Sequence, residues 1–407
     1  MGPEYRAMGA ELWRDPFPLY RRLRDEDPVH RSPEGYWVLT RFGDVFAAAR
    51  DTETFSSAQG LTFLNESELL GLAPTVVIMD PPDHTRYRRL VNRAFTPRAV
   101  SALEADLRAF VRTVIDGARQ QEEVDFVDAL AKPVPAWLVA RYLGVPDEDR
   151  GRFAAWTDAI VQAATGVYGG IGEALTELYG YFAELVELKR RRPGADLVSD
   201  LLAADEEGRG IGVEGALGYA FVLIAGGNDT TAGLLAGAAE LLTARPDQRR
   251  RLIEDPGLVD GAVEELLRLT SPVQGLCRVA TRDVAVGRGD DGAGRAGGAG
   301  GRSISAGDRV LLCYGSANRD EREFGADAGE LDVGRKIDRI LSFSSGAHHC
   351  LGAATARLMG RVFLEELLAA MPEFIVDADA GVWAGGAFTR RYEHLPFRRD
   401  GLDGLAA

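Results

Sequence analysis

The spacing of apolar residues divides the chain into a large helical body and several regions with strand-like patterns. Apolar residues recur at helical spacing almost continuously over 83–270, and again over 352–371. Alternating or continuous apolar runs typical of strands occur near 28–40, 276–315 and 374–399. The pattern predicts a mainly α fold with small β-sheets, and we expect residues 1–407 to form a single domain.

Two stretches show neither the helical nor the strand-like spacing of apolar residues. Residues from Thr54 to Val77 mix Ser, Gly and Asn with isolated apolar side chains, which is typical of a long loop of the kind that often carries function. Residues 287–301 contain eight glycines among 15 residues, with only Ala, Arg and Asp between them. Such a segment cannot bury enough apolar surface to order itself, so we expect a flexible surface insertion.

The net charge narrows the function classes. The 407 residues include 47 Lys and Arg against 62 Asp and Glu, which gives 47 − 62 = −15. Because sequence-independent binding to nucleic acid or to anionic lipid needs a positive face, we expect neither partner. Small-molecule chemistry fits this acidic, globular composition better.

Cysteine usage and apolar run lengths bear on location. The three cysteines are too few and too scattered for a disulfide framework, which is typical of a reducing compartment. The first residues show no signal-peptide pattern, and the most apolar window is shorter than the roughly 18 residues that span a bilayer. We therefore expect a cytoplasmic protein without a membrane anchor.

The most informative stretch is Phe343–Gly352, which reads Phe-Ser-Ser-Gly-Ala-His-His-Cys-Leu-Gly and precedes a predicted helix. Small residues around Cys350 let backbone N–H groups point at its sulfur, and a helix N-terminus follows it. Both effects favour a thiolate, which is a metal ligand. The simpler alternative to a metal ligand is a buried structural cysteine. A zinc site with His348 and His349 is a further option, although these adjacent ligands fit the usual zinc spacings poorly.

The Cys350 loop resembles the haem-binding signature of cytochrome P450 enzymes, and the likeness extends over nearly the whole chain. The other matching motifs are His84-x-x-x-Arg88, Gly226-Gly227-Asn228-Asp229-Thr230-Thr231, Glu265-x-x-Arg268 and Ala317-Asn318-Arg319-Asp320. Details around Leu269–Leu276 and Gly315–Glu321 resemble the actinobacterial family 130 members. Ser344 departs from the pattern, since many members carry glycine there.

The resemblance implies a cytochrome P450 fold that binds haem b with Cys350 as the axial thiolate. The haem-binding residues that it implies are His84, Arg88, Ala225, Gly226, Arg278, Phe343, Gly346, His348, Cys350 and Gly352. Four of them, His84, Arg88, Arg278 and His348, would neutralise two propionates through charge-assisted hydrogen bonds. His84 and Arg88 share one helix face, whereas Arg278 alone would read as an outward surface charge.

The segment Phe221–Thr231 is the catalytic helix in this resemblance. Gly226 and Gly227 each cost a helix about 0.5–1 kcal/mol relative to Ala, so they serve to leave space. Thr230 can bond the carbonyl four residues earlier and open a notch for dioxygen, with Asp229 as the adjacent acid. Without the cysteine loop, tight helix packing at Gly226 and a surface charge at Asp229 would be the simpler interpretation.

Glu265 and Arg268 lie one turn apart in an apolar segment, which predicts a partly buried ion pair. In the family such a pair is structural and locks its helix to the segment before the cysteine loop. Arg335 is the expected third member.

The resemblance implies a monooxygenase that inserts one atom of O2 into a hydrophobic small molecule, in natural-product tailoring or in xenobiotic or lipid oxidation. Asp229 and Thr230 would relay protons. Electrons would come from NAD(P)H through a ferredoxin or flavodoxin and its reductase, because the chain has no flavin or nicotinamide fingerprint. Oxidative coupling, peroxide-driven oxidation and non-catalytic haem binding or sensing stay open as alternatives, and we expect a monomer or weak dimer.

Two residue sets complete the expectations. An acidic electron carrier needs a local basic patch near Cys350, for which the candidates are Arg86, Arg89, Arg93, Arg357 and Arg361. The expected substrate contacts, by analogy of position, are Leu61, Phe63, Val222, Ala225, Gln274, Gly275, Leu276 and Phe388.

Overall fold

The structure is a computed structural model of the chain, and it describes residues 3–6, 10–63, 75–149, 156, 171–206, 212–287, 301–386 and 388–399. Most of the 287–301 insertion and residues 64–74 of the predicted loop therefore lie outside the described residues. The helices are α1 (Ala10–Arg14), α2 (Phe17–Glu26), α3 (Phe42–Arg50), α5 (Asp83–Val91), α6 (Pro97–Ser101), α7 (Glu104–Ala118), α8 (Pro133–Leu143), α10 (Ile171–Arg191), α11 (Leu197–Glu206), α12 (Gly212–Ala244), α13 (Pro246–Glu254), α14 (Val259–Thr270), α15 (Tyr314–Ala317), α16 (Glu321–Phe324) and α17 (Ala353–Ala370).

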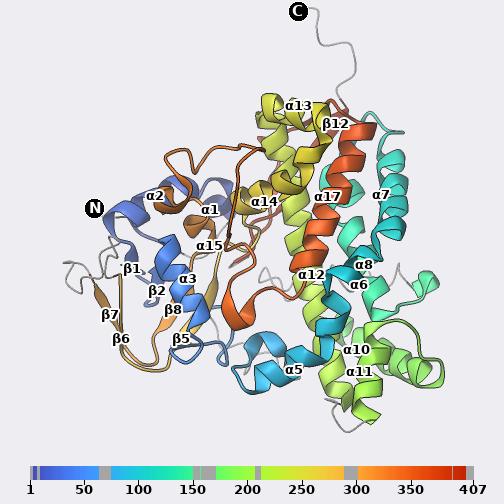
Figure 1. Cartoon of the computed structure of the whole chain (residues 1–407), viewed down its shortest axis with the longest axis horizontal. Helices are drawn as coiled ribbons and strands as arrows, with labels where there is room; N and C mark the ends of the chain where they lie inside the picture. The colour runs from blue at the N-terminus through green and yellow to red at the C-terminus, as the bar shows by residue number, and fades with distance from the viewer. Residues whose placement is uncertain are drawn as a thin grey trace, which may run out of the picture.

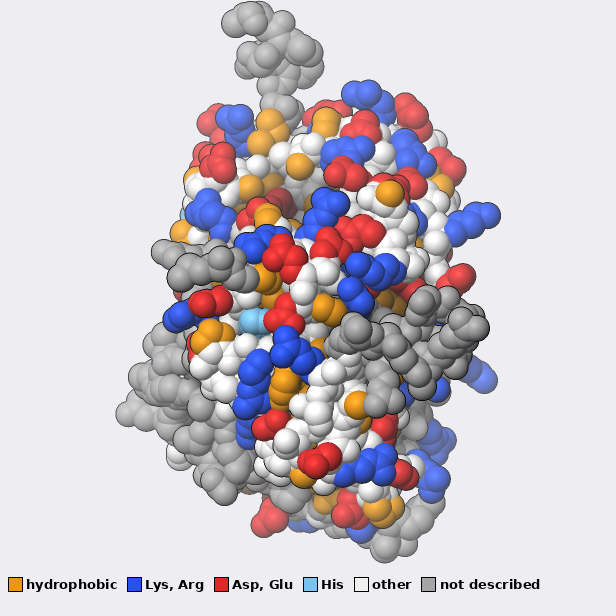
Figure 2. Space-filling view, turned by 90° about the vertical axis from the view of Figure 1, so that its left-hand side faces the viewer, with side chains coloured by type: hydrophobic (Ala, Val, Ile, Leu, Met, Phe, Trp, Pro, Cys, Tyr) orange, Lys and Arg blue, Asp and Glu red, His pale blue; other side chains and the backbone are white. Residues whose placement is uncertain are grey.

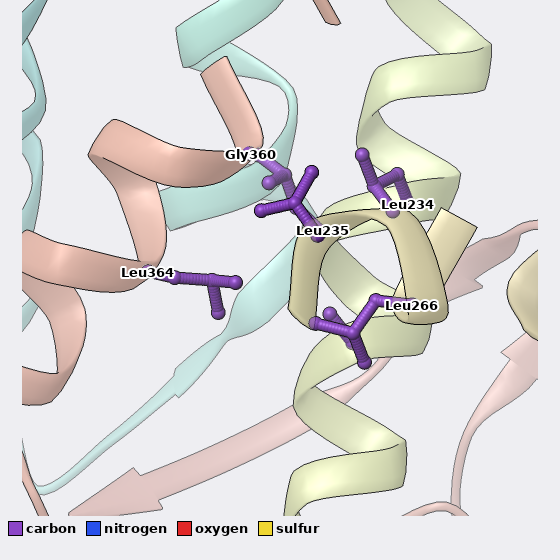
Figure 3. A pocket seen from close by; sticks show the side chains of 7 residues that line it. Leu234, Leu235, Leu266, Gly360 and Leu364 are labelled. Atoms are coloured by element: carbon purple, nitrogen blue, oxygen red, sulfur yellow. The ribbon is translucent and has the colours of Figure 1, made fainter. Parts of the chain in front are cut away.

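The long helix α12 runs through the middle of the molecule, with α17 and α7 beside it and the largest sheet on the other side (Figure 1). It packs against α8, α14 and α17. Figure 3 shows where side chains of three helices meet: Leu234 and Leu235 of α12, Leu266 of α14, and Leu364 of α17. The apolar gap between them has no room for a water molecule, so this junction is a packed core that holds α12 in place.

Local sequence explains where several helices begin and end. Pro133 occupies the first turn of α8, where its missing N–H costs nothing, and Gly144 ends the helix with φ +72°. In α17, buried residues recur at helical spacing from Leu358 to Leu368, which matches the predicted helix from Ala353 to Ala370.

The strands are short and form four sheets. They are β1 (Val29–Arg31), β2 (Trp37–Leu39), β3 (Phe55–Ser56), β4 (Glu123–Asp125), β5 (Leu276–Ala280), β6 (Val284–Val286), β7 (Arg302–Ile304), β8 (Arg309–Leu312), β9 (Phe374–Val376), β10 (Val382–Trp383), β11 (Tyr392–His394) and β12 (Pro396–Arg399). The largest sheet has the order β1-β2-β8-β5-β3, in which β2 and β8 pair in parallel and the other neighbours are antiparallel. The remaining sheets are β4-β12-β9, β10-β11 and β6-β7.

The predicted strand regions do contain strands, but two further strands were missed. β3 lies in the predicted loop and pairs with β5 through Phe55 and Ala280. β4 lies in the stretch that the sequence pattern assigned to helices, and it pairs with β12 from the end of the chain through Val124 and Phe397. Its three residues carry no period of their own, so only that distant partner makes them a strand.

The outer face of the sheet region carries mixed charges. In Figure 2 basic and acidic side chains lie interspersed over this face. The sheet region and the adjacent α2 contain surface ion pairs such as Arg31–Asp308 and Arg22–Glu26. Among the described helices, none is both long and apolar enough to cross a membrane.

Candidate active site

The cysteine loop is held in a fixed shape before α17. The N–H of Cys350 donates to the carbonyl of Phe343 at 2.8 Å, which closes the loop. Gly346 has φ +73°, and a Cβ added there would lie 2.9 Å from Cα of Arg50 at the end of α3. Only glycine combines this left-handed backbone with so close an approach, so the loop rests directly on α3.

Ser344 adopts φ +57°, which explains why glycine suits this position. The serine is kept in place by a hydrogen bond from the hydroxyl of Tyr314, which donates to its Oγ at 3.0 Å. Tyr314 belongs to α15, so the bond also ties the cysteine loop to the end of the sheet region.

Cys350 is exposed as a residue, but many protein atoms lie around its thiol group. Burial raises its pKa above the usual value, and the Gly352 N–H and the charges of Arg88 and Arg357 oppose this shift only in part. The backbone N–H group favours the thiolate, as expected, but in the metal-free protein desolvation of the thiolate has the larger effect. A bound metal cation deprotonates a coordinating thiol outright, so the thiolate at Cys350 depends on the metal.

Four cationic or imidazole groups converge above this loop. His84 and Arg88 come from α5, Arg278 from β5, and His348 from the loop itself. The rings of His84 and His348 have centroids 4.3 Å apart, and a guanidinium nitrogen of Arg88 donates to the carbonyl of Ala347 at 2.9 Å. Burial, with Arg278, His84 and Arg88 nearby, lowers the pKa of His348 to about 3.

These four groups have no acidic partner within ion-pair distance among the residues that the structure describes. Nδ1 of His84 and Nε2 of His348 are buried without a hydrogen-bond partner, and Arg278 is only 2% exposed. Buried donors of this kind need an anion. The set fits a ligand with two carboxylates whose metal faces Cys350, as haem would provide.

The middle of α12 has the predicted hydrogen bond between Thr230 and Gly226. Oγ1 of Thr230 donates to the carbonyl of Gly226 at 2.7 Å, and Gly226 is exposed with no atom within 4 Å of an added Cβ. Gly227 differs, because a Cβ there would lie 2.9 Å from Val139 of α8. One glycine therefore leaves open space, whereas the other permits close helix packing.

Asp229 does not point freely into solvent. Its Oδ2 lies 3.0 Å from Nε of Arg391, and the two side chains are 15% and 7% exposed. Arg391 directly precedes β11, far from α12 in the sequence, and sequence reasoning missed it. No local pattern could have found this partner, since tertiary packing alone brings the two residues together.

Glu265 is the centre of a buried ionic network. Its carboxylate accepts from Nε and Nη2 of Arg268 at 2.7 and 2.8 Å, and from Nε of Arg335 at 3.1 Å. The side chains of Glu265 and Arg268 are both 0% exposed. The structure thus places Arg335 where the sequence predicted it, and the network joins α14 to the segment that leads into the cysteine loop.

Two expected substrate contacts are wrong. Gln274 is 1% exposed and donates to the carbonyls of Thr270 and Ser271, while its Oε1 accepts from Tyr20 at 3.1 Å. Gly275 is also buried, and an added Cβ would lie 2.7 Å from a carbonyl of β8. Both residues pack inside the protein, so neither is available to contact a ligand.

The other expected contacts are half-buried, and several lie around β5. The carbonyl of Leu61 accepts from Cys277 at 2.7 Å, and the ring of Phe63 lies 4.3 Å from that of Tyr36. The carbonyl of Phe388 accepts from the backbone of Gln274 at 2.7 Å. The half-buried residues of this set are Leu61, Phe63, Val222, Ala225, Leu276 and Phe388.

The arginines expected to form the basic patch differ in their exposure and in their surroundings. Arg86, Arg89 and Arg93 are exposed on α5 and the turn that follows it. Arg357 instead pairs with Glu264, and Arg361 pairs with Glu104 at 2.6 Å. These two arginines are held by carboxylates of the same chain, which leaves less of their charge available to a partner.

Comparison with known proteins identifies the family of the chain. The sequence model of the family described as Cytochrome P450 matches residues 182–371. Cytochrome P450 130 of Mycobacterium tuberculosis is 49% identical, with 98% of each chain covered. The Vitamin D(3) 25-hydroxylase of Pseudonocardia autotrophica is 35% identical over 97% of this chain and 96% of its own. The solved structure of PksS, a bacillaene polyketide synthase cytochrome P450 of Bacillus subtilis, superposes with a TM-score of 0.86 at 31% identity, covering 98% and 100%.

The likeness to Cytochrome P450 130 extends over almost the whole of both chains. The chain belongs to the cytochrome P450 family and is a P450 monooxygenase, a class that binds haem through a cysteine thiolate and uses O2.

Proposed function

We propose that this enzyme inserts one oxygen atom of O2 into a hydrophobic small molecule, in natural-product tailoring or in lipid or xenobiotic oxidation. The observation that carries the proposal is the Thr230 hydroxyl bonded to the Gly226 carbonyl beside open space, with the Asp229 carboxylate adjacent. A protein that only stored or sensed haem would have no need of a proton relay at this place.

Different residues of this chain would ligate the iron, bind the propionates and transfer protons. Sγ of Cys350 would ligate the iron, and His84, Arg88, Arg278 and His348 would hold the two propionates. Bound haem supplies the redox chemistry that activates dioxygen, tuned by electron donation from the thiolate. Thr230 would orient and pass a proton at its hydroxyl oxygen, and Asp229 would resupply that proton from solvent.

The proposed substrate is apolar. Half-buried Val222 and Ala225 precede the notch on α12, and both lack polar groups. The names of the relatives are compatible with this class, since one relative is a vitamin D(3) hydroxylase and another a cytochrome P450 of polyketide biosynthesis.

The proposed electron source is NAD(P)H, through a reductase and a ferredoxin or flavodoxin. The helix that carries His84 and Arg88 also carries the exposed Arg86 and Arg89, and the exposed Arg93 follows its end. An acidic carrier docked on them would lie close to the propionate-binding donors, which shortens the electron path.

Turnover under 18O2 tests this function. Lipophilic compounds are first screened for a shift of the haem absorption spectrum, and those that bind are supplied with a ferredoxin, its reductase and NADPH. We expect a product that carries one 18O atom per molecule. A coupled dimer without 18O would favour oxidative coupling instead, and oxidation driven only by added peroxide would contradict the proposed electron supply.

A further inference from the structure

The ion pair between Asp229 and Arg391 joins the relay helix to the C-terminal strands. The distance from Oδ2 to Nε is 3.0 Å, and both side chains are largely buried. Ion pairs of such burial hold their geometry far better than surface pairs, because removing one partner leaves the other charge poorly solvated. The carboxylate is therefore held in one orientation on the side of α12 that faces the C-terminal segment.

The support for Arg391 is rigid. Gly233 lies one turn after Asp229, and a Cβ there would lie 3.2 Å from the carbonyl of Arg390 and 3.4 Å from Cβ of Arg391. On the other side, the N–H of Ala384 donates to the carbonyl of Arg391 at 3.0 Å. The backbone that carries Arg391 thus rests directly on α12 and is fixed within the β10-β11 hairpin region.

The neighbouring residues Arg390 and Arg391 contact different parts of the protein. Nε of Arg390 donates to the carbonyl of Trp13 at 2.6 Å, and its guanidinium stacks over the ring of Trp383. Arg390 therefore joins the two ends of the chain, whereas the charge of Arg391 is directed at Asp229. The backbone N–H of Arg390 also donates to the carbonyl of Pro272 at 2.8 Å, which anchors the segment a third time.

We infer that Arg391 is a positioning residue for proton delivery, which acts by fixing the orientation of the Asp229 carboxylate next to Thr230. This role rests on the proposed relay through Asp229 and Thr230 and adds a residue to it. A carboxylate that lost this partner would be free to turn away from Thr230, and the hydroxyl of Thr230 would lose the group that passes protons from solvent to it.

A double-mutant cycle tests the inference. The variants are Asp229→Asn, Arg391→Gln, the combination of both, and Arg391→Lys, all as haem-loaded enzymes. The measured quantities are product formed and peroxide released per electron. Because a positioned proton donor contributes roughly 10²–10⁴-fold, we expect Arg391→Gln to lower product formation by about tenfold or more. The double variant should be no worse than Asp229→Asn, and Arg391→Lys should recover part of the loss.

A second readout does not depend on turnover. In protein labelled with 13C-aspartate, the infrared band that disappears in Asp229→Asn belongs to the Asp229 carboxylate. We expect this band to move in Arg391→Gln and to return toward its original position in Arg391→Lys. Arg249→Gln on α13 is the matched control, since its arginine is 7% exposed and pairs with Glu373 away from the site. It should change neither product formation nor the band.

The outcomes separate the two claims. If Asp229→Asn loses product but Arg391→Gln does not, or if the two losses multiply in the double variant, Arg391 has no part in positioning and the relay stands. If Asp229→Asn keeps full product formation, the relay itself is wrong and the role of Arg391 falls with it. A band that does not move in Arg391→Gln overturns the ion pair as the source of the effect.

Discussion

At the scale of single residues, the proposed proton relay depends on the hydroxyl of Thr230. It bonds the Gly226 carbonyl at 2.7 Å and lies beside the open space that this glycine leaves. Thr230→Ala should keep the haem spectrum unchanged but divert electrons into peroxide, because the proton source at the notch is lost. Peroxide released per NADPH consumed measures this effect. Thr230→Ser keeps a hydroxyl and should stay close to the natural enzyme, whereas equal product yield from Thr230→Ala would contradict the relay.

Gly346 is the residue whose backbone most directly fixes the cysteine loop. Gly346→Ala should lower haem retention and the melting temperature, because it combines a left-handed backbone, which costs about 1–2 kcal/mol with a side chain, and a clash with Arg50. Gly307→Ala is the control, since Gly307 also has positive φ but has no atom within 4 Å of an added Cβ. If both variants retained haem equally, the contact with α3 would not matter.

At the scale of elements, the Glu265 network couples α14 to the approach to the cysteine loop. Glu265→Gln should destabilise the protein by about 3–5 kcal/mol, because the buried Arg268 would lose its counter-charge. Urea unfolding of the haem-loaded enzyme measures this change. Glu187→Gln removes an exposed carboxylate paired with Arg190 and should leave the unfolding midpoint unchanged. Equal midpoints for both variants would contradict a structural role for the buried network.

Local and distant interactions explain which features were predictable. The Thr230–Gly226 bond and the Glu265–Arg268 pair join residues three or four apart, so helical spacing alone predicts them. The Asp229–Arg391 pair, the β4-β12 pairing and the pairing of Arg361 with Glu104 join distant segments. Sequence periodicity holds no information on such partners. Gln274 was misjudged for the same reason, since Tyr20 and the end of α14 occupy its amide.

At the scale of the whole molecule, the proposed acidic electron carrier would have to dock on a chain that is itself acidic. The exposed arginines of α5 and the following turn lie at the end of the molecule opposite β12 (Figure 1). Reduction by an acidic ferredoxin should therefore slow as salt rises, since screening acts within about 10 Å at 0.1 M ionic strength.

Charge reversal locates this docking surface. Arg89→Glu should slow reduction by ferredoxin at low salt and weaken its salt dependence, because it removes attraction without touching the haem-binding donors. Stopped-flow reduction rates at several salt concentrations check this. Arg398→Glu makes the same charge change on exposed β12 and should have no effect; equal slowing by both variants would mean that net charge alone matters.

The most direct test of the whole account is the absorption spectrum of the reduced, carbon-monoxide-treated protein. We predict the Soret band typical of a haem thiolate. This band should be lost in Cys350→Ser. Serine at either of the other two cysteine positions, Cys277 and Cys313, should leave the band unchanged. A histidine-type band in the undamaged natural protein, or a chain that stays colourless after reconstitution with haem, would contradict Cys350 as the iron ligand.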